Sequence, residues 1–423
     1  MSDMIKLPRA EESRLNRWIE EIDQFNDTPG NGTTRHYMTA TECVCRSYIK
    51  KEMEALGLSA KVDCMGNIYG TLYGSEPELA PVWTGSHFDT VLHGGRFDGV
   101  AGVVAGMEAL RLIAASGVAH RRNLTVIAYA GEEPARFGIG CIGSRAMAGH
   151  LNVSDLKALR DANGVWLYDE MKTRGFNPDT IETCRRRSGD VFCSIELHIE
   201  QNSILEQKCF PLGIVKAICS ALNFVVTVTG QAAHAGGMPM EVRKDAYTAA
   251  CEMSMTLERL VRENRLSEYC TGTVGYVQLS PNAPNIIPGQ VQFTVDIRDC
   301  NAASKDTLMA AVQEEFRKIA EKRGVGLHMD LQNNDKPVVS DPALMAALEQ
   351  HAAARGYETC QLISGPFHDS LFLGTFTPVG MLFVPSKAGL SHCPEEWTDT
   401  LYLKAGAEVL ADALLDVANR DTL

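Results

Sequence analysis

Three short apolar runs, each followed by acidic or histidine residues, constrain the fold of this sequence most strongly. They occupy residues 82–88, 124–130 and 192–198, and each has the length and apolar content of a buried strand. Between the first two, residues 98–115 have a helical pattern rich in Gly and Ala, which indicates close packing against a sheet. Strands that alternate with helices predict an α/β domain. In open α/β sheets, ligands bind at the carboxyl ends of the strands, where these polar residues would gather.

The length of the chain predicts two domains, because 423 residues exceed what one hydrophobic core usually serves. From about residue 213 the pattern predicts strands at 224–229, 272–279, 291–298 and 325–331, and helices at 245–265 and 305–324. This β-α-β-β-α-β order is that of the ferredoxin-like split motif. We therefore expect an inserted domain at residues 213–332. It would interrupt a first domain formed by residues 1–212 and 333–423.

The composition argues against several kinds of partner. The formal charge of −13 is offset by no basic stripe, so we expect neither a nucleic acid nor an anionic membrane as partner. The N-terminus lacks the apolar segment of a secretory signal, and no uninterrupted apolar span of about 20 residues occurs. Thirteen cysteines without CxxC pairs fit a reducing compartment, so we expect a cytoplasmic protein.

Histidine and carboxylate residues at the predicted strand ends indicate a metal-dependent hydrolase site. The residues 85–99, GSHFDTVLHGGRFDG, contain two candidates, the second strand ends at a Glu-Glu pair, and another His follows late in the chain. A site with two metal ions needs a bridging carboxylate, further ligands on each ion and a free carboxylate to move protons. The alternative for residues 85–99 is a polar turn between a strand and a helix. The candidates are His87, Asp98, Glu132, Glu133, His198 and His392.

The order of several motifs resembles that of the M20 metallohydrolases. The motifs are TGSHFDT, GGRFDGVAGV, GEEPARFGIGCIGSRAMAG, ELHIEQ, AAHAGGMPMEVRKDA, PNIIPGQVQFTVDIRD, SGPFHDS and LFVPSKAGLSHCPEE. They are most similar to the amidase branch, which contains N-carbamoyl-L-amino-acid hydrolases, β-ureidopropionases, allantoate amidohydrolases and, most similar of all, the ureidoglycolate amidohydrolase group. The resemblance implies an α/β fold in which a mixed-sheet dimetal hydrolase domain is interrupted by an inserted α+β ferredoxin-like dimerisation (lid) domain.

The resemblance also implies which residues bind metal. His87 and His198 would hold one ion, Glu133 and His392 the other, and Asp98 would bridge the two. Two divalent ions per subunit are implied, with Mn²⁺ as the first choice. Zn²⁺ is the alternative, because carboxylate and imidazole ligands accept both metals.

Three further residues would take part in catalysis. Glu132 would be the general base, and Asp89 would orient His87, since metal-binding histidines commonly donate their other ring nitrogen to a carboxylate. His234, from the inserted domain, would stabilise the oxyanion of the tetrahedral intermediate.

Substrate contacts are implied on both domains, and in the family some of them reach across a homodimer built on the inserted domains. Arg298 would bind a substrate carboxylate through two parallel hydrogen bonds, and Gln201 would contact the ureido end. The full set is Gln201, His234, Asn285, Arg298, Phe367 and His368.

These features predict an amidohydrolase that cleaves the C–N bond of a small ureido or carbamoyl carboxylate and releases ammonia, as in purine and ureide catabolism. Ureidoglycolate and allantoate are the substrates that the resemblance favours. A His at position 198 argues against a dipeptidase, because the resemblance implies an acidic residue there in peptidases. The alternatives are an N-carbamoyl-L-amino-acid hydrolase or β-ureidopropionase, a dipeptidase, an aminohydrolase on another amine and a metal-free binding module. Asn202, Met238 and Phe367 depart from the family pattern and leave the acyl group of the substrate open.

Overall fold

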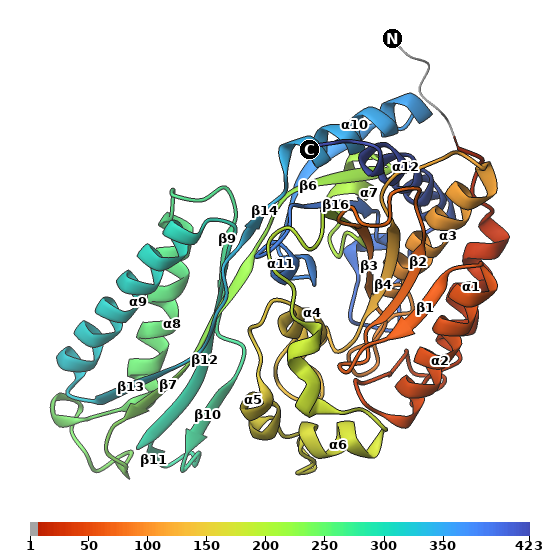
Figure 1. Ribbon diagram of the computed structural model, residues 1–423. Helices are drawn as coiled ribbons and strands as arrows, with labels where there is room; N and C mark the ends of the chain where they lie inside the picture. The colour runs from red at the N-terminus through yellow and green to blue at the C-terminus, as the bar shows by residue number, and fades with distance from the viewer. Residues whose placement is uncertain (1–6) are drawn as a thin grey trace. The chain divides into compact units, whose positions relative to one another are not determined.

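The computed structural model describes residues 7–423, which form two compact units (Figure 1). The first unit contains the described residues up to Lys216 together with Val339–Leu362 and His368–Leu423. The second contains Ala217–Val338 and Ile363–Phe367. The second unit is therefore an insertion in the chain of the first.

A nine-stranded mixed sheet forms the centre of the first unit, in the order β1-β2-β4-β3-β5-β16-β6-β14, with β15 paired to β6. The strands β4, β3, β5 and β16 are parallel, whereas β1, β2 and β6 pair in antiparallel fashion. Strand bounds are β1 (Ser59–Val62), β2 (Ile68–Leu72), β3 (Val82–His87), β4 (Leu124–Tyr129), β5 (Cys193–Ile199), β6 (Leu212–Ile218), β14 (Val338–Val339), β15 (Thr359–Ser364) and β16 (Val379–Val384).

The four parallel strands are buried along their whole length, as expected for strands covered on both faces. Helices α3 (Val100–Ser116) and α12 (Thr400–Ala418) pack against each other and against this part of the sheet. Close approach explains the glycines of α3: a Cβ on Gly102 would lie 2.1 Å from the carbonyl oxygen of Leu197. The Gly- and Ala-rich pattern of this helix thus predicted its packing correctly.

In β5, side chains alternate between the two faces of the sheet. Leu197 lies toward α3 and α12, whereas Glu196 accepts hydrogen bonds from Ser370 at the start of α11. The remaining helices are α1 (Glu12–Asp23), α2 (Ala40–Ala55), α4 (Ile142–Met147), α5 (Val153–Ala158), α6 (Leu167–Thr173), α7 (Ile204–Lys208), α10 (Pro342–Arg355), α11 (Ser370–Leu373), η1 (Pro178–Cys184) and η3 (Lys387–Gly389).

The second unit is a five-stranded antiparallel sheet packed against two helices, with its own apolar core. The strand order is β10-β12-β7-β13, and β9 also pairs with β12. Phe293 of the sheet and Phe316 of a helix pack at the centre of this core. The elements are β7 (Ser220–Thr229), β8 (Ala233–His234), η2 (Met240–Val242), α8 (Ala246–Glu263), β9 (Cys270–Thr273), β10 (Val277–Ser280), β11 (Ile286–Ile287), β12 (Gln290–Asp299), α9 (Ala302–Arg323) and β13 (Gly326–Asn334).

One sequence-based expectation about the second unit is wrong. The predicted strand at residues 272–279 is two strands, β9 and β10, which pair with different parts of β12. Between them Tyr276 exchanges hydrogen bonds with Thr294, and the chain shifts along β12 at this point. Apolar periodicity does not register such a break, because both halves keep the same alternation.

None of the helices within residues 7–423 is both long enough and apolar enough to cross a bilayer. The longest helix of the first unit, α12, contains buried Glu408 and Asp412. Both carboxylates bind Arg355 of α10, so this helix belongs to the protein core.

Candidate metal centre

Five of the candidate ligands converge at the carboxyl edge of the parallel strands. His87 is the last residue of β3, His198 is the second-last residue of β5, and Glu133 lies just beyond β4. Asp98 precedes α3, whose tight packing on the sheet carries it to the same edge, and His392 follows η3. Two groups of ligand atoms, each within 4.8 Å, share Asp98: the first adds His87 and His198, and the second adds Glu133 and His392. A group of the same spacing joins His87 with Glu132 and Glu133.

The two oxygens of Asp98 face different groups. Oδ1 lies 3.4 Å from Nε2 of His87 and 3.2 Å from Nε2 of His198. Oδ2 lies 3.1 Å from Nε2 of His392, which is itself 3.2 Å from Oε1 of Glu133. Ligands bound at 2.0–2.2 Å to one ion lie about 3.0–3.6 Å from each other. Both groups therefore have the spacing of a divalent-metal site.

The hydrogen bonds of two histidines leave their metal-facing nitrogens as acceptors. Nδ1 of His87 lies 3.0 Å from the carbonyl oxygen of Asp89, and Nδ1 of His198 lies 2.9 Å from that of Ile199. A carbonyl oxygen can only accept, so Nδ1 carries the proton in each ring and Nε2 of the neutral ring presents a lone pair. Within residues 7–423, the buried Oδ1 of Asp98 has no hydrogen-bond donor. Nε2 of His198 also faces the N–H of Gly99 at 3.3 Å. The three ligand atoms still converge on one point, which suits a cation, and the donor set fits a divalent metal.

The charges of the centre are strongly coupled. Burial disfavours the ionised form of Asp98, but the neighbouring imidazoles of His198, His392 and His87 hold its pKa well below the usual value. Hydrogen bonds to Asp98 and Glu133 raise the pKa of His392 to about 11. Both shifts have the same cause: the carboxylates favour positive charge at the position where a metal ion would lie.

Asp89 acts differently from the expectation. Its carboxylate lies 3.9 Å from Nδ1 of His87, and the backbone carbonyl of Asp89 holds the ring instead. The carboxylate accepts hydrogen bonds from three successive N–H groups, those of Gly131, Glu132 and Glu133, at 3.0–3.1 Å. Asp89 therefore fixes the turn that carries both glutamates. Asp89 thus contacts the ring of His87 through its carbonyl and not through the carboxylate that the sequence suggested, because the turn offers the carboxylate more donors.

Glu132 is buried next to the first group, with Oε2 3.8 Å from Nε2 of His87. Burial raises its pKa well above the usual value. A buried carboxylate with a raised pKa is a stronger base than an exposed one, which suits the uptake and return of a proton.

His368 lies beneath the centre rather than on an open surface. Its ring is buried and meets the ring of His198 edge to face, with the centroids 4.4 Å apart. Glu196, His198 and His368 form a further group with ligand spacing. However, the carboxylate of Glu196 already accepts from Ser86 at 2.8 Å and from Ser370 at 2.6 Å, so this group supports the sheet edge.

A hydrogen-bond network next to His392 was not predicted from the sequence. Gln201 donates through Nε2 to Oδ2 of Asp98 at 2.9 Å and to Ser391 at 3.3 Å. Ser391 also contacts Glu396, which is buried. The acidic pair that follows His392 was the available signal, but sequence alone does not tell which of two adjacent glutamates points inward.

The remaining predicted substrate residues belong to the second unit. His234 lies in β8 and is exposed, and its Nδ1 accepts from the N–H groups of Gly236 and Gly237 at 3.1 Å. Asn285 is exposed, and its carbonyl accepts from the N–H of Ala235. The pairing of β8 with β11 thus brings His234 and Asn285 together.

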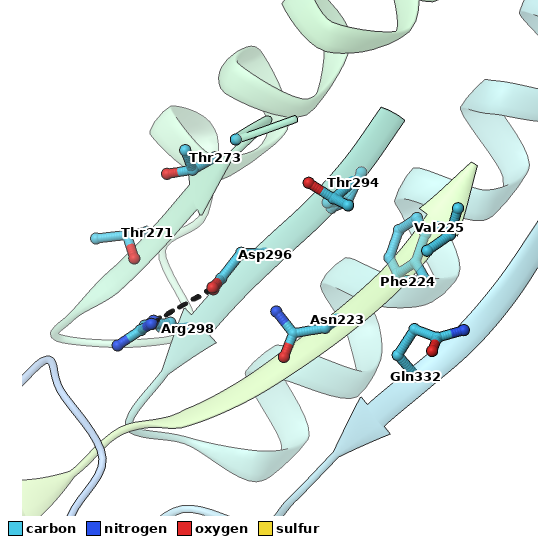
Figure 2. Close-up of a pocket in the computed structure, with 11 residues that line it drawn as sticks. Asn223, Phe224, Val225, Thr271, Thr273, Thr294, Asp296, Arg298 and Gln332 are labelled. Carbon is cyan, nitrogen blue, oxygen red and sulfur yellow. Dashed lines mark hydrogen bonds and ion pairs between the residues drawn. The ribbon is translucent and has the colours of Figure 1, made fainter. Parts of the chain in front are cut away.

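Arg298 lines a cavity of about 560 Å³ on the sheet of the second unit (Figure 2). Nε lies 3.2 Å from Oδ1 of Asp296, and the guanidinium lies 5.8 Å from the ring centroid of Phe367. Thr271 and Asn223 line the same cavity beside Arg298. The lining therefore contains a cation, its partner carboxylate Asp296 and neutral polar groups.

Comparison with known proteins adds four similarities. The family model of peptidase family M20/M25/M40 matches residues 83–416. Ureidoglycolate hydrolase of Oryza sativa subsp. japonica is 37% identical over 404 residues, covering 95% of this chain and 83% of that protein. N-carbamoyl-L-amino-acid amidohydrolase of Paenarthrobacter aurescens is also 37% identical over 404 residues, covering 96% and 97%. The crystal structure of AtUAH in complex with glyoxylate superposes with a TM-score of 0.85 at 34% identity, covering 98% and 99% of the two chains.

Proposed function

This chain belongs to peptidase family M20/M25/M40, and from that premise we propose that it is a dinuclear metal-dependent amidohydrolase. It cleaves the C–N bond of a small ureido or carbamoyl carboxylate and releases ammonia. The resemblance that the motifs suggested is confirmed by the family match and by the named relatives. Their names are those of ureide and carbamoyl amide hydrolases, and the proposal transfers that reaction class to this chain.

The observation that carries this proposal is the geometry of Asp98. One oxygen faces His87 and His198, and the other faces His392. A carboxylate shared between two groups of ligands is what a bridged pair of ions requires. We assign Mn²⁺ to the pair, with Zn²⁺ as the alternative, because these carboxylate and imidazole ligands accept both. When bound, the ions supply an acidified water and polarise the substrate carbonyl.

Glu132 is the proton carrier in this proposal. Its carboxylate takes a proton as water adds to the ureido carbonyl carbon, and it returns that proton to the nitrogen that leaves as the C–N bond breaks. The hydrogen bonds from the 131–133 turn to Asp89 keep Glu132 in position during both transfers. The carbamate product then decomposes to carbon dioxide and ammonia.

Residues on both units bind the substrate in this proposal. Arg298 binds the substrate carboxylate, and His234 with Asn285 stabilises the oxyanion. Gln201 contacts the ureido end, and Phe367 and His368 shape the pocket. The exposed positions of His234 and Asn285 leave both groups free for a ligand.

We further propose that the two units have separate roles. Residues 1–212 and 333–423 form the catalytic metal-binding domain, and residues 213–332 form a ferredoxin-like lid that also makes a homodimer. The strand and helix order β7, α8, β9–β10, β12, α9, β13 supports this assignment. We place the protein in the cytoplasm, because all thirteen of its cysteines are free thiols.

An N-carbamoyl-L-amino-acid hydrolase is the second candidate, because that relative is as similar to this chain as the ureidoglycolate hydrolase is. A panel assay of ammonia release separates the two. Purified protein with added Mn²⁺ is given ureidoglycolate, allantoate, N-carbamoyl-β-alanine and N-carbamoyl-L-amino acids. We expect the highest kcat/KM on ureidoglycolate or allantoate. A preference for an N-carbamoyl-L-amino acid would favour the second candidate, and no turnover of any of these substrates would reject the proposal.

A further inference from the structure

We propose that Glu396 is a positioning residue that fastens the bridging aspartate to the loop carrying His392, and that metal affinity depends on it. The inference rests on the proposed two-metal site and adds a residue to it. Glu396 touches no ligand atom of the centre in this proposal. It acts on the backbone of Asp98 and on the side chain next to His392.

The carboxylate of Glu396 is buried and accepts three hydrogen bonds. Oε1 accepts from the N–H of Phe97 at 2.9 Å and from the N–H of Asp98 at 3.0 Å. Oε2 accepts from Oγ of Ser391 at 2.8 Å. One side chain thus joins the turn that presents Asp98 to the segment that presents His392.

The chain makes room for this carboxylate at Gly95. A Cβ on Gly95 would lie 2.1 Å from Oε1 of Glu396, so no other residue fits there without moving the carboxylate. Gly95 does not have a positive φ. Its side chain is therefore excluded by the approach of Glu396 and not by backbone strain.

Glu396 determines the position of Asp98 relative to His392. Ser391 has one hydroxyl hydrogen and two acceptors within reach, Oε2 of Glu396 at 2.8 Å and Oδ2 of Asp98 at 3.0 Å. Without the Glu396 carboxylate, the buried N–H groups of Phe97 and Asp98 lose their acceptor, which costs about 1–3 kcal/mol for each unsatisfied group. The turn would then shift toward other acceptors and move Asp98 away from His392.

A second contact makes the variant testable, because it joins the same two segments. The rings of Phe97 and Trp397 meet edge to face with their centroids 5.3 Å apart. This contact does not involve Glu396. We therefore expect Glu396→Ala to fold with the segment of Trp397 still packed on Phe97, although the hydrogen bonds of the Glu396 carboxylate are lost.

The test measures Mn²⁺ affinity by calorimetric titration of chelator-treated protein, together with the thermal midpoint. We expect Glu396→Ala to weaken Mn²⁺ binding about 10- to 100-fold, the range for residues that orient metal ligands. Glu395→Ala, at the exposed neighbour, keeps wild-type affinity. Gly95→Ala reproduces the loss because its methyl group displaces the carboxylate.

Wild-type Mn²⁺ affinity in a folded Glu396→Ala protein would overturn the inference. If Glu396→Ala does not fold, Gly95→Ala decides alone, and wild-type affinity in that protein overturns the inference. A wild-type protein that binds no Mn²⁺ would instead refute the proposed two-metal site, and with it the proposed role of Glu396.

Discussion

Nε2 of His392 lies 3.1 Å from Oδ2 of Asp98, although the two residues belong to segments of the first unit that lie before and after the second unit in the chain. Asp98 precedes α3, whereas His392 lies in the loop between η3 and α12. Their contact closes the second ligand group. The proposed chemistry therefore depends on the packing of the C-terminal segment as much as on the strand ends.

Glu132→Gln should abolish most of the activity while metal binding persists. The amide keeps the shape of the side chain but cannot take a proton from water, so we expect kcat to fall about 10²- to 10⁴-fold. Steady-state kinetics on the best ureide, with metal analysis of the same sample, gives both numbers. Full turnover by the variant would exclude Glu132 as the base.

Arg298→Ala should weaken the binding of substrates that carry a carboxylate. Loss of a charge-assisted hydrogen-bond pair costs about 1.5–3 kcal/mol, which corresponds to about 10- to 150-fold in KM. The neutral carboxamide analogue of the substrate should lose much less. Arg259→Ala is the control, since Arg259 is a cation of the same unit that pairs with Glu263 on the surface of α8. An equal effect on both substrates would show that Arg298 does not bind the carboxylate.

Gly102→Ala should destabilise the first unit by about 1–3 kcal/mol or more, because its methyl group would collide with the backbone at Leu197. Gly106→Ala is a graded comparison: its nearest atom is Cγ2 of Val126 at 2.8 Å, which belongs to a side chain that can move. Urea unfolding monitored by circular dichroism measures both variants. A Gly102→Ala protein as stable as Gly106→Ala would contradict the close packing of α3.

Acid should remove the contribution that the ionised Asp416 carboxylate of α12 makes to the free energy of unfolding. The hydrogen bond from His351 and the ion pair with Arg420 lower the pKa of Asp416 to about 2, whereas an unfolded aspartate has a pKa of about 3.9. A lowered folded-state pKa stabilises the fold above pH 4, and the contribution disappears as the pH falls from about 4 to 2. Its size is at most about 2 kcal/mol, since the carboxylate is partly exposed to solvent.

Asp416→Asn tests this expectation. The free energy of unfolding of the wild type should exceed that of the variant by a constant amount between pH 5 and 7, and the difference should shrink at pH 4 and again at pH 3. Urea titrations at these pH values measure it. A difference that grows on acidification would mean that the sign of the shift is wrong.

Local pattern predicted much of the fold. The apolar runs at 82–88, 124–130 and 192–198 correspond to β3, β4 and β5, and the helix expected at 305–324 is α9, Ala302–Arg323. The pattern missed β1, a strand of four residues that is partly exposed at the edge of the sheet, and β2, which has only five residues. Runs this short give a weak alternation signal. It also predicted β9 and β10 as a single strand, because a shift in strand pairing does not change the apolar periodicity of the sequence.

The candidate ligands were accessible from sequence because each stands at a strand end or beside a motif. Their supporting contacts were not. Asp89 serves the 131–133 turn through its carboxylate, and Glu396 serves Asp98 through backbone N–H groups. Backbone donors are present at every residue, so the sequence does not indicate which of them a buried carboxylate will bind.

The central claim is that Asp98 is shared by two metal ions, and counting bound ions tests it most directly. Chelator-treated protein is loaded with Mn²⁺, freed of excess and analysed for metal per chain. We predict two ions in the wild type, one in His198→Ala, which removes a ligand of one ion only, and none in Asp98→Ala. Two ions in Asp98→Ala, or a single ion in the wild type, would contradict the claim.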